Sequence, residues 1–354
     1  MKNPSGVLEI FKELTSAPTA PFHEESVIKK AKGWIKNNFG NGITVKEHRG
    51  GLVVSYGERG APALALAAHL DHPGFSLDRV NNKGARAELL GGLPKDQLVG
   101  AAVQAFAAGA PDNRPEALGR FGSPDGELYP VTWTSAPPRV RPAFAVLDLP
   151  ACEVGGPWLA SRSIDDLLGC AISLEVLRRL VRERAKANLI VLLHRAEEVG
   201  FIGALDLIES GAVDPGTSVL SIETSKRLPR AVPGRGPILR TGDKAVLFDP
   251  NLEELLREAA KGRRVQRRRM NGGTCEATAY QAYGYEAGGL AIPLVNYHNR
   301  GPRRVLPEMV KLADIQPAVE VLVAAAKLFP GKTLRGALRS RLGARLKKMA
   351  PRLN

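Results

Sequence analysis

The chain has 354 residues, enough for one large domain or two smaller ones. Its composition, 44% hydrophobic and 24% charged, is that of a folded globular protein, and no run of about 18 apolar residues indicates a transmembrane helix. The formal net charge of +14 comes mainly from residues 261–269 and 327–354, so the rest of the chain is close to neutral.

The first 74 residues predict two helices, a hairpin and one buried strand. Residues 5–38 have helical periodicity with a break at Pro18 and Pro21. Two short β-branched runs flank Gly50 and Gly51 and predict a hairpin. The segment "PALALAAHLDHPG" at 62–74 is a continuous apolar run that ends in polar groups, which is typical of a buried parallel strand.

Residues 75–158 differ in composition and periodicity from the segments on either side. They are rich in Gly and Pro, lack long helical periodicity, and contain short candidate strands at 127–135 and 141–149. This pattern predicts a smaller, β-rich inserted domain.

Strands and helices alternate again from residue 159 to residue 330. Helices are predicted after Asp166 and over 202–210, 251–262 and 307–329; strands are predicted over 158–164, 188–194, 217–223 and 288–298. Such alternation favours a three-layer α/β/α domain with a mostly parallel mixed sheet, formed by residues 1–74 and 159–330.

Residues 331–354 form a basic C-terminal tail. Leu334, Leu338, Leu342 and Leu346 lie four residues apart among arginines, which predicts a basic amphipathic helix. Two interpretations stay open: a solvated, solubilising extension, or a surface that binds nucleic acid or a membrane.

The cysteines indicate the redox compartment. Cys152, Cys170 and Cys275 are odd in number and widely spaced, which favours a reducing compartment over a disulfide framework. The first 16 residues contain no apolar signal-peptide core, so we expect a cytoplasmic protein.

Metal-binding side chains follow five predicted strands or loops: His69 and Asp71, Asp165 and Asp166, Glu197 and Glu198, Glu223, and His298. Since parallel strands end at one edge of a sheet, these groups are expected to lie together. A single Asp can be only a helix cap and a single His only structural, but those explanations do not predict one shared edge. Imidazoles and carboxylates without thiolates suit Zn²⁺, Mn²⁺ or Co²⁺.

The adjacent Glu197 and Glu198 would repel each other if both were buried and uncompensated. Two cations about 3.5–4 Å apart would hold them, with one glutamate as a ligand and the other accepting a proton from water. The pair therefore favours a dinuclear hydrolytic site.

This order of motifs resembles the M42 family of dinuclear metalloaminopeptidases, in the wider clan of co-catalytic zinc aminopeptidases and carboxypeptidases. The resemblance extends from Leu8 to about Phe329 and depends on "AHLDHPG", "SIDDLLGCA", "RAEEVGFIGA" and "GGTCEATAYQAYG". It implies that residues 1–74 and 159–330 form the catalytic metallopeptidase domain, and that the inserted domain takes part in contacts of a homo-oligomer.

The resemblance also implies two divalent cations per subunit, with zinc expected and cobalt or manganese as alternatives. The first cation would be held by His69 and Glu223, the second by Glu198 and His298, and Asp165 would bridge them. The family usually has Asp where this chain has Glu223.

Two further roles are implied by the same resemblance. Asp71 would orient the site, and Glu197 would be the general base that activates metal-bound water. The Asp165–Asp166 peptide bond would be cis. Cys275 and Glu276 stand where many family members read Gly-Thr-Asp-Ala, so the substrate pocket is expected to differ.

The predicted function is therefore a dinuclear metal-dependent aminopeptidase that hydrolyses N-terminal residues from peptides. A metal-dependent amidase, deacylase or carboxypeptidase-like hydrolase of the same clan is the nearest alternative. A nucleic-acid- or membrane-surface-binding protein, or a metal-free relative, would be a different class.

Overall fold

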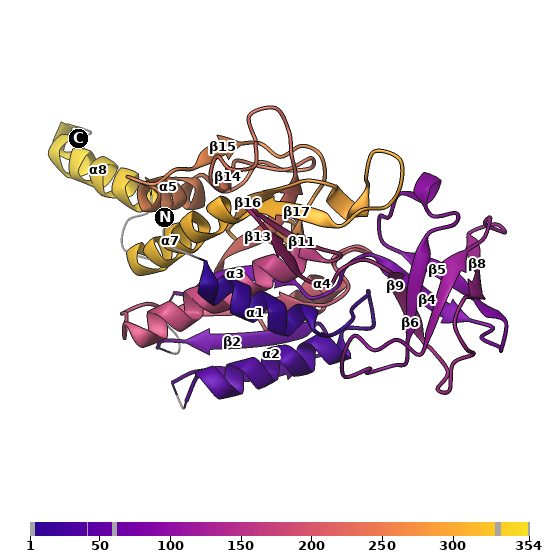
Figure 1. Cartoon of the computed structure of the whole chain (residues 1–354). Coiled ribbons are helices and arrows are strands. Elements are labelled where there is room, and N and C mark those ends of the chain that lie inside the picture. The colour runs from indigo at the N-terminus through magenta and orange to yellow at the C-terminus, as the bar shows by residue number, and fades with distance from the viewer. Residues whose placement is uncertain (1–3, 41, 59–61, 330–333, 353–354) are drawn as a thin grey trace.

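The computed structural model describes residues 4–40, 42–58, 62–329 and 334–352. Its centre is an eight-stranded mixed sheet in the order β1-β2-β12-β3-β13-β16-β14-β15 (Figure 1). The strands are β1 (Thr44–His48), β2 (Gly51–Tyr56), β12 (Leu189–His194), β3 (Leu64–His69), β13 (Ser218–Lys226), β16 (Ala287–Leu294), β14 (Ile238–Arg240) and β15 (Gln266–Arg268).

The four central strands, β12, β3, β13 and β16, are parallel to one another. Every residue of β3 and of β16 is buried, as expected for strands covered on both faces. The register pairs His194 with His69, so β12 and β3 end side by side at one edge of the sheet.

Helices cover both faces of this sheet. One face packs on α1 (Ser5–Thr15), α2 (Glu25–Asn38), α3 (Ile164–Arg182), α5 (Pro250–Ala259) and α7 (Leu312–Leu328). The other face packs on α4 (Ile202–Glu209) and α6 (Glu276–Ala282). The predicted three-layer α/β/α fold with a mostly parallel mixed sheet is confirmed.

Six strands between residues 74 and 147 close into a barrel, which lies beside the three-layer body (Figure 1). In barrel order they are β4 (Gly74–Asp78), β5 (Gly84–Leu90), β8 (Leu128–Trp133), β7 (Ala117–Phe121), β6 (Ala102–Phe106) and β9 (Phe144–Leu147). A short 3-10 helix, η1, spans Lys95–Gln97. The barrel has its own core, in which Phe75 contacts Phe121 and Tyr129.

A separate three-stranded sheet corrects two expectations. Strands β10 (Glu153–Gly155), β11 (Trp158–Ser161) and β17 (Glu308–Lys311) pair antiparallel, so the strand before Asp165 is not part of the parallel sheet. Residues 308–311, predicted as the start of a helix, form β17 because they pair with β11; the helix α7 begins only at Leu312.

The predicted tail helix is present as α8 (Leu334–Met349), followed by a 3-10 turn, η3, at Ala350–Arg352. Over its whole length its apolar and charged residues are only weakly segregated, so the predicted amphipathic pattern is not confirmed. Residues 331–333 and 353–354 of the predicted tail lie outside the described residues. In the described part of the chain, no helix is both long and apolar enough to cross a membrane.

Candidate active site

The seven predicted site residues all lie at one edge of the sheet: His69, Asp71, Asp165, Glu197, Glu198, Glu223 and His298. They reach it by different local routes. His69 is the last residue of β3, and Glu223 lies within β13, which extends to Lys226 rather than ending at the glutamate. His298 lies in the 3-10 turn η2 (Tyr297–Asn299), four residues after β16 ends.

Asp165 lies between the two histidines. Its Oδ1 is 3.8 Å from Nε2 of His69, and its Oδ2 is 3.7 Å from Nε2 of His298. The Asp165–Asp166 peptide bond is cis, as the family resemblance implied. Thr224 donates a hydrogen bond of 3.0 Å to Oδ1 and fixes the carboxylate. One carboxylate thus presents one oxygen to each imidazole.

Two groups of possible ligands share Asp165. In one, His69, Asp165 and Glu223 have ligand atoms within 4.8 Å of one another; in the other, Asp165, Glu198 and His298 do. Nε2 of His298 is 3.2 Å from Oε1 of Glu198. The site therefore has the donors for two neighbouring cations with one bridging carboxylate.

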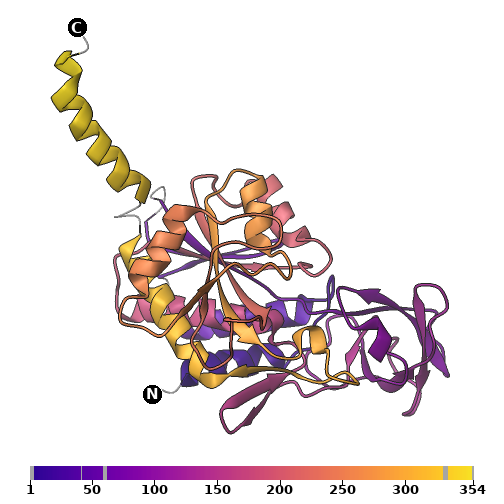
Figure 2. The same cartoon turned by 90° about the horizontal axis from the view of Figure 1, so that it is seen from above.

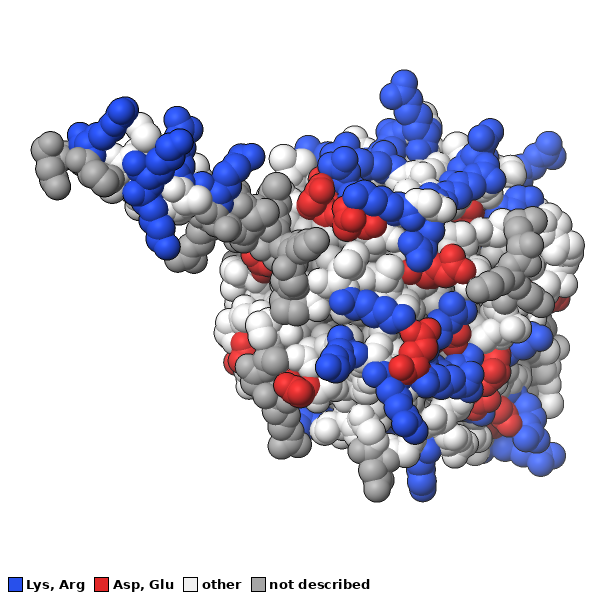
Figure 3. All heavy atoms as spheres, turned by 90° about the vertical axis from the view of Figure 1, so that its left-hand side faces the viewer, with Lys and Arg blue, Asp and Glu red and all other residues white. Residues whose placement is uncertain are grey.

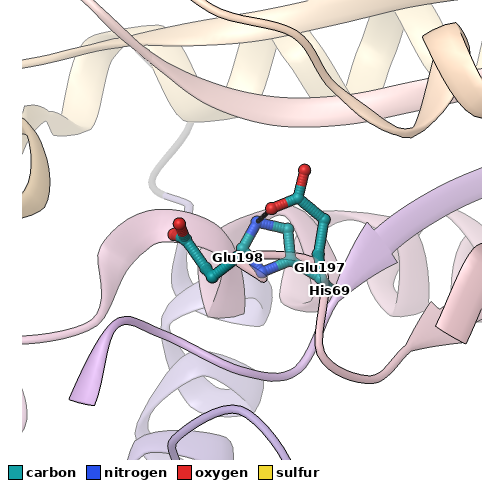
Figure 4. A group of neighbouring side chains, drawn as sticks. All are labelled: His69, Glu197 and Glu198. Atoms are coloured by element: carbon teal, nitrogen blue, oxygen red, sulfur yellow. Dashed lines mark ion pairs between the residues drawn. The ribbon is translucent and has the colours of Figure 1, made fainter. Parts of the chain in front are cut away.

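Glu197 and Glu198 point in different directions although they are adjacent. Figure 4 shows their carboxylates on opposite sides of the His69 ring, with Glu197 paired to the ring at 3.7 Å between Oε2 and Nε2. The two side chains diverge, but His69, Glu197 and Glu198 still have ligand atoms within 4.8 Å of one another, so the two like charges remain close enough to repel.

Asp71 fixes the chain that carries both glutamates. Its Oδ1 accepts a hydrogen bond of 3.0 Å from the backbone N–H of Glu197, and its Oδ2 accepts one of 3.1 Å from that of Glu198. Oδ1 is also 3.6 Å from Nδ1 of His69, and the Asp71 side chain is fully buried. A single carboxylate therefore aligns the end of β3 with the loop after β12.

Burial and mutual repulsion shift the ionisation of the acids. Burial raises the pKa of Glu197 well above its ordinary value; His69 opposes this rise, and Glu198 adds to it. Burial and then Glu276 raise the pKa of Glu223 in the same direction. Burial alone would lower the pKa of His69, but Glu197 and Asp71 outweigh it and leave that pKa well above its ordinary value. Positive charge is therefore favourable at this site.

The donor set fits divalent cations. Buried Oε1 of Glu198 and Nε2 of His298 face each other at 3.2 Å without forming a hydrogen bond, and neither atom has a hydrogen-bond partner among the described residues; Oδ2 of Asp166 has none either. Unpaired buried polar atoms are costly and rare in native proteins, so they need a partner. Imidazole and carboxylate donors without a thiolate suit Zn²⁺, Mn²⁺ or Co²⁺.

Glu308 is a functional candidate that the sequence did not reveal. It is fully buried on β17, and its Oε2 accepts the backbone N–H of Asp165 at 2.9 Å while its Oε1 accepts that of His298 at 2.8 Å. Its carboxylate thus joins the bridging residue to the η2 turn, in which His298 has a φ of 51°. No local motif marks Glu308, because its partners lie elsewhere in the chain.

Glu276 is a second unpredicted member of the site. It is fully buried at the start of α6, and Glu197, Glu223 and Glu276 have oxygens within 4.8 Å of one another. The Ser221 hydroxyl lies 3.0 Å from both Glu223 and Glu276, and Nδ1 of His194 is 3.4 Å from Glu276. The "GGTCEA" segment signalled a departure here, but spacing alone did not indicate where its carboxylate points.

The family model for M42 glutamyl aminopeptidase matches residues 142–321, just over half of the chain. The chain therefore belongs to the M42 peptidase family and is a metal-dependent aminopeptidase, a hydrolase of peptides.

Solved structures show the same fold at low sequence identity. A TET aminopeptidase from Thaumarchaeota archaeon SCGC AB-539-E09 has a TM-score of 0.78 at 18% identity, with 94% of this chain and 99% of that one covered. An aminopeptidase from Desulfurococcus kamchatkensis has a TM-score of 0.75 at 21% identity, with 93% and 96% covered. The TET1 peptidase of Pyrococcus horikoshii has a TM-score of 0.72 at 20% identity, with 90% and 99% covered.

Proposed function

We propose that this chain removes N-terminal residues from peptides at a site holding two divalent cations, with zinc as the first expectation and cobalt or manganese as alternatives. The observation that carries the proposal is Asp165, which faces His69 with one carboxylate oxygen and His298 with the other. A bridging carboxylate with terminal donors on both sides is what a dinuclear site requires.

His69 and Glu223 would hold one cation, Glu198 and His298 the other, and Asp165 both. When bound, such cations polarise a peptide carbonyl and lower the pKa of a coordinated water molecule to about 7, which makes hydroxide available for hydrolysis near neutral pH.

Glu197 is proposed as the general base. Its carboxylate lies among the ligands but points away from Glu198 (Figure 4). The raised pKa that burial gives Glu197 suits a group that accepts a proton from the attacking water and returns it to the leaving amine. Asp71 would act through position alone, because its oxygens are engaged with the N–H groups of Glu197 and Glu198.

We also propose a preference for an acidic N-terminal residue. Arg240 is only 3% exposed and lines a pocket together with Glu223, Met270 and Tyr297. Its Nε has no hydrogen-bond partner among the described residues, and no described carboxylate forms an ion pair with its guanidinium.

The Arg240 guanidinium lies over the Phe248 ring. Burial alone would lower its pKa, but the acids Glu223, Asp243 and Glu276 oppose burial and raise that pKa without forming an ion pair with Arg240. A buried cation whose Nε has no described partner, beside the proposed ligands, favours a substrate carboxylate.

The proposed organisation follows the sequence division. Residues 1–74 and 159–330 would be the catalytic domain, 75–158 the inserted β domain, and 331–354 the basic tail. The barrel strands β4–β9 support the insertion, whereas β10 pairs only with β11 and would place the boundary slightly earlier. The Pyrococcus horikoshii TET1 peptidase assembles into a tetrahedron or an octahedral shell, which supports a homo-oligomer here. The three free cysteines support a cytoplasmic location.

The decisive experiment compares the wild type with Glu197→Gln for metal content and for hydrolysis of peptides with free or blocked amino termini. We expect about two cations to be retained by both proteins, and turnover by the variant to fall by roughly 10²–10⁴-fold. Cleavage of blocked peptides would instead indicate an amidase or deacylase. Absence of hydrolysis by the wild type with Zn²⁺, Mn²⁺ and Co²⁺ would refute the proposal.

A further inference from the structure

Helix α8 is strongly basic and extends away from the three-layer body (Figure 2). Its sequence, "LRGALRSRLGARLKKM", has six Lys or Arg residues and no acid. Figure 3 shows the Lys and Arg side chains along this projecting helix, with no acidic side chain visible among them. The helix contacts the body through α5.

The described half of α8 exposes an apolar stripe. Leu342, Leu346 and Met349 are 54%, 62% and 41% exposed. Their spacings of four and three residues place them on one face of the helix. Arg341 and Arg345, both exposed, lie to one side of this stripe. The helix thus presents large apolar side chains next to positive charge.

The second basic segment, residues 261–269, differs from α8 because the body engages several of its cations. Arg267 forms an ion pair with Glu253, and Lys261 forms one with Glu258. Arg269 donates a hydrogen bond to the backbone carbonyl of Asp243. By contrast, no ion pair is found for the described cations of α8, residues 341–349, within the described part of the chain.

We propose that α8 binds the surface of an anionic lipid bilayer. Its cations would lie against the lipid headgroups, and Leu342, Leu346 and Met349 would enter the boundary with the acyl chains. Six cations on one helix fall within the range typical of segments that bind anionic lipids. Charge and apolar exposure are both accounted for by this one partner.

Other partners account for only part of the feature. A second copy of α8 would bring two sets of six cations together, which is repulsive. Nucleic acid would satisfy the cations through its phosphates but would not bury the apolar stripe. The helix also lacks the aromatic side chains on which bases of single strands stack.

The test is flotation of the full chain with vesicles of phosphatidylcholine, with or without about 30% phosphatidylglycerol, at low and high salt. We expect flotation only with the anionic vesicles and less of it at high salt. Two variants separate the contributions: L342S/L346S/M349S removes the stripe, and R341Q/R345Q/K347Q/K348Q removes four cations. Each should lower vesicle partition by roughly tenfold or more.

A matched control loses four exposed cations elsewhere, in K29Q/K36Q/K46Q/K83Q, and should float like the wild type. Circular dichroism and peptidase activity would show that every variant remains folded, since none of these residues belongs to the site. The proposal is overturned if the wild type does not float, or if the stripe variant floats fully. It is equally overturned if the control loses as much as the α8 charge variant, or if duplex or single-stranded nucleic acid binds in preference to anionic vesicles.

Discussion

Replacing Glu308 with alanine tests whether the proposed metal ligands depend on support from outside the ligand set. The variant leaves the backbone N–H groups of Asp165 and His298 without their acceptor, and both lie in buried or half-buried surroundings. Each unsatisfied N–H costs about 1–3 kcal/mol, giving about 2–6 kcal/mol for the pair.

Part of that cost is offset because Glu308 is itself an unfavourable buried acid. Burial and then Asp165 raise its pKa well above the ordinary value, although the two N–H donors oppose the rise. Removing the carboxyl group relieves this penalty, so we expect a net loss of about 2–4 kcal/mol in the free energy of unfolding. Urea denaturation of the metal-free protein measures it.

The same substitution should weaken metal binding. Groups that orient metal ligands typically contribute about 10–100-fold to affinity or activity, and Glu308 orients two segments that carry proposed ligands. Competition with a chelator gives the dissociation constants directly. Glu308→Gln, which keeps one acceptor oxygen, should give an intermediate loss.

A suitable control is Glu127→Ala, because Glu127 is exposed on a barrel loop. Its stability should change by less than about 0.5 kcal/mol. If Glu308→Ala were as stable as this control and bound metal with unchanged affinity, the positioning role of Glu308 would be wrong.

Three other outcomes follow from named contacts. Arg240→Gln should lower kcat/KM for an N-terminal Glu about 10–100-fold relative to an N-terminal Leu, measured with paired chromogenic substrates, because a charge-assisted hydrogen bond is lost. Burial and Asp71, opposed by Arg195, raise the pKa of Glu24 to about 7. The contribution of Glu24 to stability is therefore full below about pH 4.5 and is lost as the pH rises through 7. Denaturation of Glu24→Gln, measured across this pH range, should lack that loss of stability. A Cβ on Gly169 would lie 2.5 Å from the Ile222 carbonyl oxygen, so Gly169→Ala should lower the free energy of unfolding by about 1–3 kcal/mol. A lower melting temperature in thermal denaturation would show this loss.

Periodicity was sufficient to predict most of the catalytic fold. The uninterrupted apolar runs that became β3 and β12 required burial on both faces, and helical spacing after Asp166 required a long core helix, which is α3. Strand β17 could not be predicted in this way. It has only four residues, and its pairing with β11 joins segments about 150 residues apart.

The candidate site was accessible to sequence reasoning for a topological reason. Parallel strands end at one edge, so a polar residue at each strand end, such as His69, is predictably near the others. Glu308 and Glu276 lie at the start of a strand and of a helix, and their contacts depend on tertiary packing. No rule of spacing relates Glu308 to Asp165, 143 residues away.

The adjacency of Glu197 and Glu198 can be explained by the different roles of the ligand candidates and of the residues, such as Asp71, that hold them in place. Asp71 holds both backbone N–H groups, so the two side chains are forced to diverge from one fixed segment. Divergence lets one carboxylate meet His298 while the other stays beside His69. The two substitutions should therefore have different effects. Glu197→Gln should retain the cations but lose turnover, whereas Glu308→Ala should first lose affinity for the cations. If both variants lost cations to the same extent, Glu197 would be acting as a ligand and its role as a base would have to be abandoned.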